Sequence, residues 1–171
     1  TITNTLSGAS TLVTDSDAAA VLETTGGDMT VTAATATSVT ATSSGSIDAN
    51  TTDIAAATTV SLTATDEVNV GLDAAVSATV SAGGTTGSTI DDAAGDTLTT
   101  LSLSGNGSAH TFDLRAAEGV NSITATGSQN VTVGMDLSEV SALTTALTFT
   151  DSSTGTSTVV LDTADAGAAT D

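Results

Sequence analysis

Val60-Ser-Leu-Thr-Ala-Thr65 alternates apolar side chains with hydroxyl-bearing ones, residue by residue. This period of two is typical of a β-strand that buries one face and leaves the other in water. Thr and Val favour such strands because branching at Cβ restricts their side-chain rotamers. The stretch therefore predicts a strand, and its recurrence elsewhere decides the fold.

Similar segments recur at a regular spacing along the chain. They start at Val39, Val60, Val80, Leu101, Ile123 and Leu147, with Leu22 and Ile2 extending the series upstream. A turn-rich stretch such as Gly83-Gly-Thr-Thr-Gly87 follows each segment, because Gly, Asn and Asp tolerate the positive φ angles of turns. A second short strand comes next, carrying in successive units Ile47, Val70, Ile90, Phe112, Val133 and Val159.

Two strands in each unit of about 20–24 residues predict an all-β solenoid, a stack similar to a parallel β-helix. One unit cannot bury its own apolar face, whereas stacked units share a continuous core. We expect residues 1–171 to form a single repetitive β domain, with helical turns only at 18–22 and 137–146 on the connecting side. An antiparallel β-sandwich is the alternative, since it also has short strands at regular intervals.

The charge of the chain restricts its partners. Twenty acids and a single cation, Arg115, give a formal net charge of −19. Nucleic acids and anionic membranes need several cations on the protein, so neither is an expected partner. No apolar run approaches the roughly 20 residues that span a bilayer. His110 is the only histidine, and a catalytic triad or a histidine metal site would depend on it alone, so we expect no enzyme.

Aspartate follows an apolar residue at the end of most second strands. Stacked units would place these acids above one another, and their repulsion would need a cation between them. Ca²⁺ prefers such oxygen ligands. The candidate metal ligands are therefore Asp73, Asp91, Asp92, Asp96, Asp113, Asp136 and Asp162. The alternative is that each Asp accepts hydrogen bonds from backbone N–H groups of its own turn.

Two segments, Leu98-Thr-Thr-Leu-Ser-Leu-Ser-Gly105 and Gly119-Val-Asn-Ser-Ile-Thr-Ala-Thr-Gly-Ser-Gln-Asn-Val-Thr-Val133, carry a family resemblance. They resemble repetitive regions of bacterial RTX-type surface-layer proteins and related type I-secreted repeat proteins. The resemblance implies a segment of a larger secreted protein that binds Ca²⁺ at the bacterial cell surface. It also implies self-assembly into an extracellular lattice or filament.

The chain departs from the RTX pattern in one respect. The Gly-Gly-x-Gly-x-Asp nonapeptide of RTX calcium-binding repeats is absent, and Gly26-Gly-Asp28 is at most a fragment of it. Calcium binding at that density is therefore not expected. The alternative function is an adhesin stalk, or a carbohydrate-binding module that recognises cell-surface polysaccharide. With only Phe112 and Phe149 as aromatic residues, the chain offers few platforms for a sugar ring.

Overall fold

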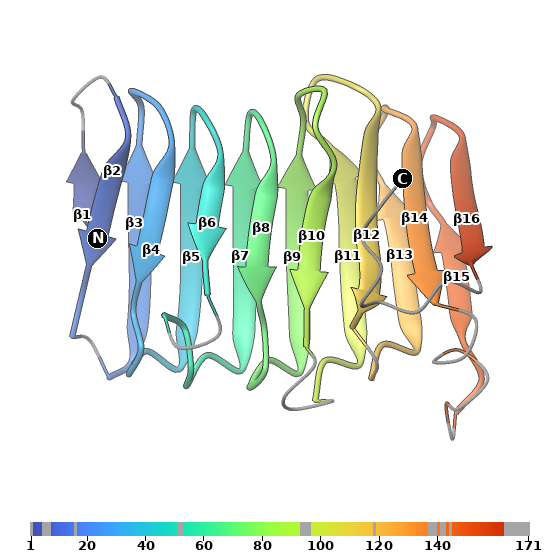
Figure 1. Cartoon of the computed structure of the whole chain (residues 1–171), viewed down its shortest axis with the longest axis horizontal. Helices are drawn as coiled ribbons and strands as arrows, with labels where there is room; N and C mark the ends of the chain where they lie inside the picture. Colours follow the sequence, from blue (N-terminus) through green and yellow to red (C-terminus); the bar gives the residue numbers. More distant parts are fainter. Residues whose placement is uncertain are drawn as a thin grey trace.

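The computed structural model shows a β-solenoid (Figure 1). It describes residues 2–4, 8–15, 17–50, 53–92, 97–117, 119–136, 140, 143 and 145–162. These residues form sixteen strands that divide into two eight-stranded sheets, and all neighbouring strands in both sheets run parallel. The predicted solenoid is confirmed. The sandwich alternative is wrong because its strands would pair in an antiparallel sense.

Odd-numbered strands form one sheet and even-numbered strands the other, so the chain changes sheet after every strand. The odd sheet consists of β1 (Ile2–Asn4), β3 (Ala19–Thr24), β5 (Ser38–Ser43), β7 (Thr59–Ala64), β9 (Ser77–Ala82), β11 (Thr100–Gly105), β13 (Ser122–Thr126) and β15 (Thr148–Asp151). The even sheet consists of β2 (Ser10–Val13), β4 (Met29–Thr32), β6 (Ile47–Ala49), β8 (Val68–Gly71), β10 (Ser88–Asp91), β12 (His110–Ala116), β14 (Val131–Asp136) and β16 (Ser157–Asp162).

The register confirms part of the predicted spacing. Val39 pairs with Val60, and Ile2 pairs with Leu22 at the start of the stack, as their spacing predicts. Other intervals depart from it in both directions. The interval is shorter between Met29 and its partner Ile47, and longer between Val131 and its partner Ser157. The unit is therefore more variable in length than the sequence pattern predicts.

Several predicted pairs are displaced by two positions. Val80 aligns with Leu62 rather than with Val60, because β9 follows β7 along the chain more closely than β7 follows β5. Phe149, not Leu147, aligns with Ile123. A slip of two positions keeps the same side chains on the same face of the sheet, so the apolar pattern tolerates it.

The core runs along the stack between the two sheets. One of its rows alternates larger and smaller side chains, in the order Leu22, Ala41, Leu62, Val80, Leu103 and Ala125. These six side chains are all buried. Burial of one leucine contributes about 1.5–3 kcal/mol, so repetition of the row stabilises the whole stack.

From β3 onward, short arches connect each odd strand to the following even strand, and they lie together at one end of the strands (Figure 1). Gly84 and Gly107 adopt positive φ angles of 76° and 80° there, as the turn prediction requires. The Asp28 carboxylate accepts a hydrogen bond from Ser46 N–H at 2.9 Å in the next arch. Polar side chains therefore connect neighbouring arches.

The expected helical turn at 18–22 is wrong, since most of that stretch belongs to β3, where its apolar residues alternate in and out. Most of 137–146 lies outside the described residues. No helix in the described ranges combines the length and the apolar character needed to cross a membrane.

Candidate functional site: acidic side chains of the even sheet and its loops

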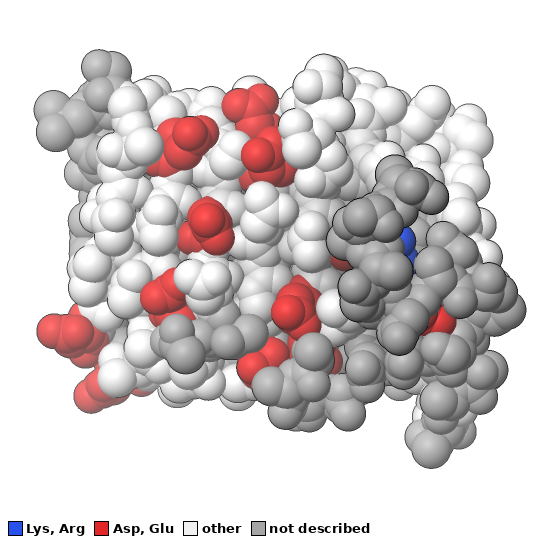
Figure 2. Space-filling model, viewed as in Figure 1, with Lys and Arg blue, Asp and Glu red and all other residues white. Residues whose placement is uncertain are grey.

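Acidic side chains on the outer face of the even sheet are separated from one another by neutral ones. Figure 2 shows this over the part of the face formed by β2 to β10. Asp48 is flanked in register by Thr30 and Asn69. Asp91 is flanked by Gly71 and by Ala116. The expected continuous column of carboxylates is therefore wrong for these strands, because the slips in register carry each Asp past the next.

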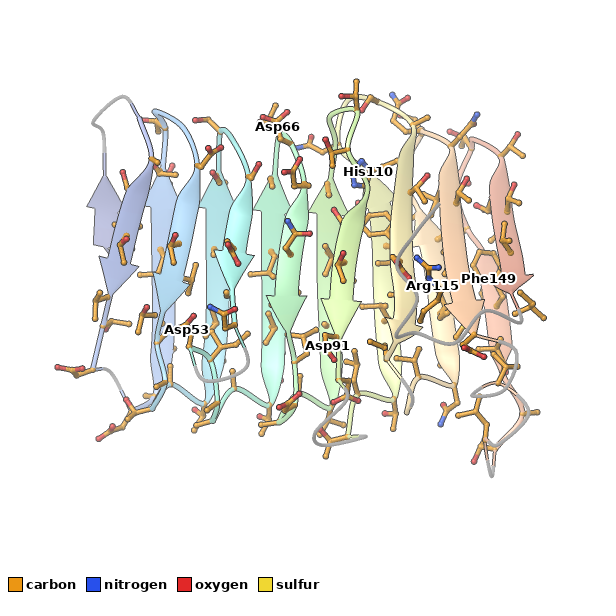
Figure 3. All side chains as sticks on the ribbon, in the orientation of Figure 1. Asp53, Asp66, Asp91, His110, Arg115 and Phe149 are labelled. Atoms are coloured by element: carbon orange, nitrogen blue, oxygen red, sulfur yellow. The ribbon has the colours of Figure 1, made fainter. Side chains whose placement is uncertain are left out.

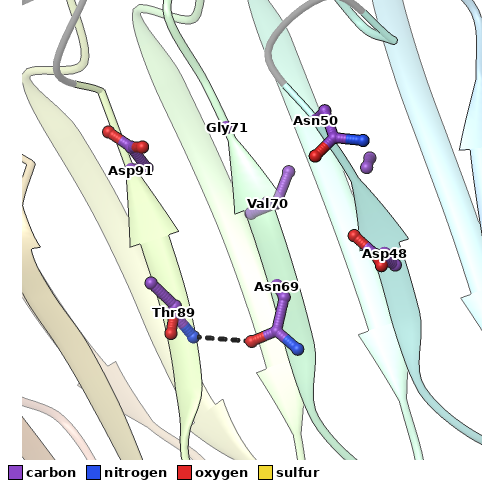
Figure 4. A pocket seen from close by; sticks show the side chains of 8 residues that line it. Asp48, Asn50, Asn69, Val70, Gly71, Thr89 and Asp91 are labelled. Atoms are coloured by element: carbon purple, nitrogen blue, oxygen red, sulfur yellow. Dashed lines mark hydrogen bonds between the residues drawn. The ribbon is translucent and has the colours of Figure 1, made fainter. Parts of the chain in front are cut away.

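A shallow hollow opens on this face where β8 has no side chain (Figure 4). Gly71 lies between Asn50 and Asp91, and the hollow measures about 300 Å³. Asn69 Oδ1 accepts a hydrogen bond from Thr89 N–H at 3.2 Å across its floor. Asp48 and Asp91 are its two carboxylates, and both belong to an open surface.

Asp73 and Asp92 lie in neighbouring loops at the end of the strands opposite the arches. The backbones of these loops are in direct contact, since Leu72 N–H donates to Asp91 O at 2.7 Å. Asp92 has an exposed fraction of 0%, and its Oδ2 accepts a hydrogen bond from Leu98 N–H at 2.8 Å. Asp73 Oδ1 is buried, and no hydrogen-bond donor among the described residues reaches it.

Thr97 connects the same two loops. Its hydroxyl is 2.9 Å from both Asp73 O and Ala75 O. Buried carboxylate oxygens and carbonyl oxygens thus occur in these two loops, and oxygens of both kinds are ligands that Ca²⁺ takes. Of the predicted ligands whose side chains the structure describes, Asp73 and Asp92 are in the environment that best fits a cation. Asp91 is adjacent to Asp92 in sequence but faces the open hollow.

Asp113 is engaged by the only cation of the chain. Arg115 Nη2 lies 2.6 Å from Asp113 Oδ2, and Arg115 Nε and backbone N–H both donate to Oδ1. These hydrogen bonds hold the pKa of Asp113 below its ordinary value, although partial burial acts in the opposite direction. The Arg115 N–H that donates to Asp113 lies within β12, so Asp113 accepts a backbone hydrogen bond inside its strand and not in a turn. The ion pair leaves Asp113 poorly suited to a metal.

Asp136 and Asp162 are the one pair of predicted ligands that the register of the described strands places side by side. Asp136 is 3% exposed and ends β14. Asp162 ends β16 and pairs in register with Asp136, so two aspartates occupy neighbouring positions here, as the column prediction requires. Asp96 lies outside the described residues.

Hydrogen bonds to nearby backbone occur at acids outside the predicted set as well. Asp53 Oδ2 accepts from Asn50 N–H at 3.0 Å, and Asp151 Oδ1 accepts from Ser153 N–H at 2.9 Å. Figure 3 shows Asp66 at the arch end of the strands, whereas Asp53 and Asp91 lie toward the opposite end. The acids thus occupy both ends of the strands as well as the even face.

A buried Ser–His contact was not predicted from the sequence. Ser88 Oγ lies 2.8 Å from His110 Nε2, and Val68 N–H donates to the same Ser88 oxygen at 2.8 Å. His110 also packs edge-on against Phe112, with ring centroids 5.0 Å apart. Burial lowers the pKa of His110 below its ordinary value of 6.5. The inward position of Ser88 in an otherwise apolar row is the signal that could have indicated a polar partner in the core.

The described residues contain no group of three or more His, Cys, Asp or Glu side chains close enough to hold a metal ion. Any cation bound at Asp73 and Asp92 would therefore draw on backbone oxygens as well. Comparisons with protein-family models, with curated proteins and with solved structures found no match to this chain. The fold and the side chains themselves carry the functional argument.

Proposed function

We propose that this chain is a structural segment of an extracellular bacterial surface layer or filament, stabilised by Ca²⁺. The observation that carries the proposal is the single core that continues through every strand pair from β2 to β14. Such a stack is stiff along its axis, because each unit is bonded to its neighbours by parallel ladders on both sides. Three hollows on the described residues, next to Gly71, Phe112 and His110, are open surface depressions, which suits a scaffold better than a catalyst.

The edges of the stack support assembly. Within the described residues, β1 and β15 each pair on one side only in the odd sheet, as do β2 and β16 in the even sheet. Unpaired strand edges bind further strands readily. A further unit, from the same chain or from a second copy, would extend both sheets in the same direction. A second copy of the chain is thus the first partner that we propose.

Calcium would act at the loops rather than along the sheet. A cation between Asp73 and Asp92 would satisfy the buried Asp73 Oδ1 and join the loop after β8 to the loop after β10. Any ligand that binds only the folded chain raises its stability by mass action. The chain would then gain this stability only where it meets Ca²⁺, which is compatible with export first and folding outside the cell afterwards.

Thermal unfolding with excess chelator and with added Ca²⁺ tests the calcium part of this proposal. We expect a higher midpoint with Ca²⁺ for the wild type and for Asp48→Asn, whose carboxylate faces the open hollow. The double variant Asp73→Asn, Asp92→Asn should lose the calcium response. An unchanged wild-type midpoint would remove Ca²⁺ from the mechanism.

Negative-stain microscopy of the purified chain tests the structural part. We expect rods or sheets that lengthen with protein concentration. Single particles of one unit length at every concentration would contradict self-assembly and favour the alternative of an adhesin stalk. Because the two measurements are independent, loss of the calcium response would leave the structural proposal standing.

A further inference from the structure

The outer face of the odd sheet is a regular grid of hydroxyl groups. Outward positions on β5, β7, β9, β11, β13 and β15 are occupied by Ser or Thr in three rows. The rows are Ser38, Thr59, Ser77, Thr100, Ser122 and Thr148; Thr40, Ser61, Thr79, Ser102, Thr124 and Thr150; and Thr42, Thr63, Ser81, Ser104 and Thr126. We call these side chains the hydroxyl grid.

The grid is uncharged although the chain carries a net charge of −19. Strands β5, β7, β9, β11 and β13 contain no Asp, Glu, Lys or Arg. Glu23 on β3 and Asp151 at the end of β15 border the grid. Among the described residues, other acids lie on the even face (Figure 2) and toward the strand ends, where Figure 3 shows Asp53, Asp66 and Asp91. If this surface served only solubility, charged side chains would be expected in this region as they are elsewhere on the chain.

The hydroxyl groups of the grid point to solvent. All of its side chains are at least partly exposed. Among the described residues, one grid hydroxyl has a hydrogen bond to the protein, that of Thr126, which donates to Leu103 O at 3.3 Å. The others are available to water, and each can both donate and accept a hydrogen bond.

The spacing of the grid is periodic in two perpendicular directions. Neighbouring strands lie about 4.8 Å apart, and alternate residues along a parallel strand lie about 6.6 Å apart. Five strand intervals and two residue steps give a face of about 24 Å by 13 Å. The ladders on both sides of each strand and the buried row beneath hold these positions fixed.

We propose that the hydroxyl grid binds the surface of ice. The oxygen atoms of the prism face of hexagonal ice also repeat in two perpendicular directions, one short and one longer, with lengths comparable to those of the grid. Water molecules held between the three rows would complete the match. Bulk water competes for each hydroxyl, so a single bond gives little net free energy. A rigid repeating array favours ice over liquid water, because all of its hydroxyl groups can form hydrogen bonds to one ice lattice at the same time.

Ice fits this face better than a polysaccharide or an ion does. Sugar recognition commonly uses aromatic platforms, and the only aromatic residue on the grid strands, Phe149, is partly buried against the core. Protein sites for cations are commonly built from carboxylates, which the grid lacks. Charged side chains also orient water in a way that ice cannot adopt, so their exclusion from the grid follows from the proposal.

The test is the gap between melting and freezing temperatures of a single ice crystal in the presence of the purified chain. We expect the wild type to open such a gap and to shape the crystal into facets. Thr79 lies at the centre of the grid, and Thr79→Tyr keeps strand propensity while raising a bulky ring above the face. This variant should lose most of the gap.

Thr111→Tyr is the matched control, because Thr111 is an exposed outward residue of β12 on the other sheet. It should keep the wild-type gap. Thr40→Tyr on β5 gives an independent second test, should Thr79→Tyr have a lower unfolding midpoint than the control. A wild type without a gap, or equal losses in Thr79→Tyr and Thr111→Tyr, would overturn the proposal. So would a wild-type dimer that only the grid variants dissociate, since that result assigns the face to a second copy.

Discussion

Replacement of Leu103 by alanine tests whether the stack depends on its core rows. Leu103 is 0% exposed and lies between Val80 on β9 and Ala125 on β13. Backbone ladders fix β11 on both sides, so the neighbouring strands cannot close the cavity that the substitution creates. We therefore expect a loss of about 3–4 kcal/mol, within the range for buried leucines. That is a large fraction of the roughly 5–15 kcal/mol that stabilises a typical domain.

Urea unfolding followed by circular dichroism measures this loss, provided that the slope of the transition stays constant. Hydrogen exchange would locate it, because a repeat stack can open in parts. A loss below about 1 kcal/mol would refute the core assignment.

A double-mutant cycle tests the register itself. Leu103→Ala should couple to Val80→Ala by about 0.5 kcal/mol or more. It should be additive with Leu22→Ala, four strands away, and equal coupling to both would contradict the pairing.

Three further predictions concern individual side chains. Because the pKa of His110 is depressed in the folded chain, the unfolded chain binds a proton at this residue more readily. The contribution of neutral His110 to stability is therefore complete above pH 6.5 and is lost as the pH falls below it. The urea midpoint of the wild type should fall relative to that of His110→Leu between pH 7 and pH 5. Gly107→Ala should destabilise by about 1–2 kcal/mol in urea, because φ is 80° while nothing lies within 4 Å of an added Cβ. Arg115→Gln should cost less than about 1 kcal/mol at pH 7, since the pair is partly exposed; NMR titration should show the pKa of Asp113 rising toward its ordinary value.

The alternation of side chains predicted the strands and their faces. Val60 and Leu62 are buried and Ser61 points outward, as the period of two requires. Register was less accessible, because a shift of two positions leaves that pattern unchanged. The slip at Val80 follows from the lengths of the segments that connect the strands. The residues of the strands themselves do not indicate which register those lengths impose.

The side-chain partners in contacts between neighbouring units could not be predicted from the sequence either. Ser88 and His110 are 22 residues apart and meet only because β10 and β12 are neighbours. The lone histidine gave no indication of a partner among so many serines. For the acids, the sequence predicted their place after apolar residues. It did not predict that Asp73 would have one buried oxygen while Asp113 is engaged by Arg115.

The register changes the argument for a cation. On the even sheet, an acid on one strand faces Thr, Asn, Gly or Ala on the next, with Asp136 and Asp162 as the exception in the described strands. Like charges two strands apart are about 9.6 Å distant, which exceeds the screening length of about 8 Å at physiological salt. In one diagonal pair on neighbouring strands, Asp91 and Asp113, the ion pair of Asp113 with Arg115 offsets the repulsion. Away from Asp136 and Asp162, repulsion along the sheet therefore does not require Ca²⁺, so we expect a calcium effect on stability to come from buried carboxylate oxygens such as those of Asp73 and Asp92. If Asp48→Asn, which only removes surface charge, abolished the calcium response, this reasoning would be wrong.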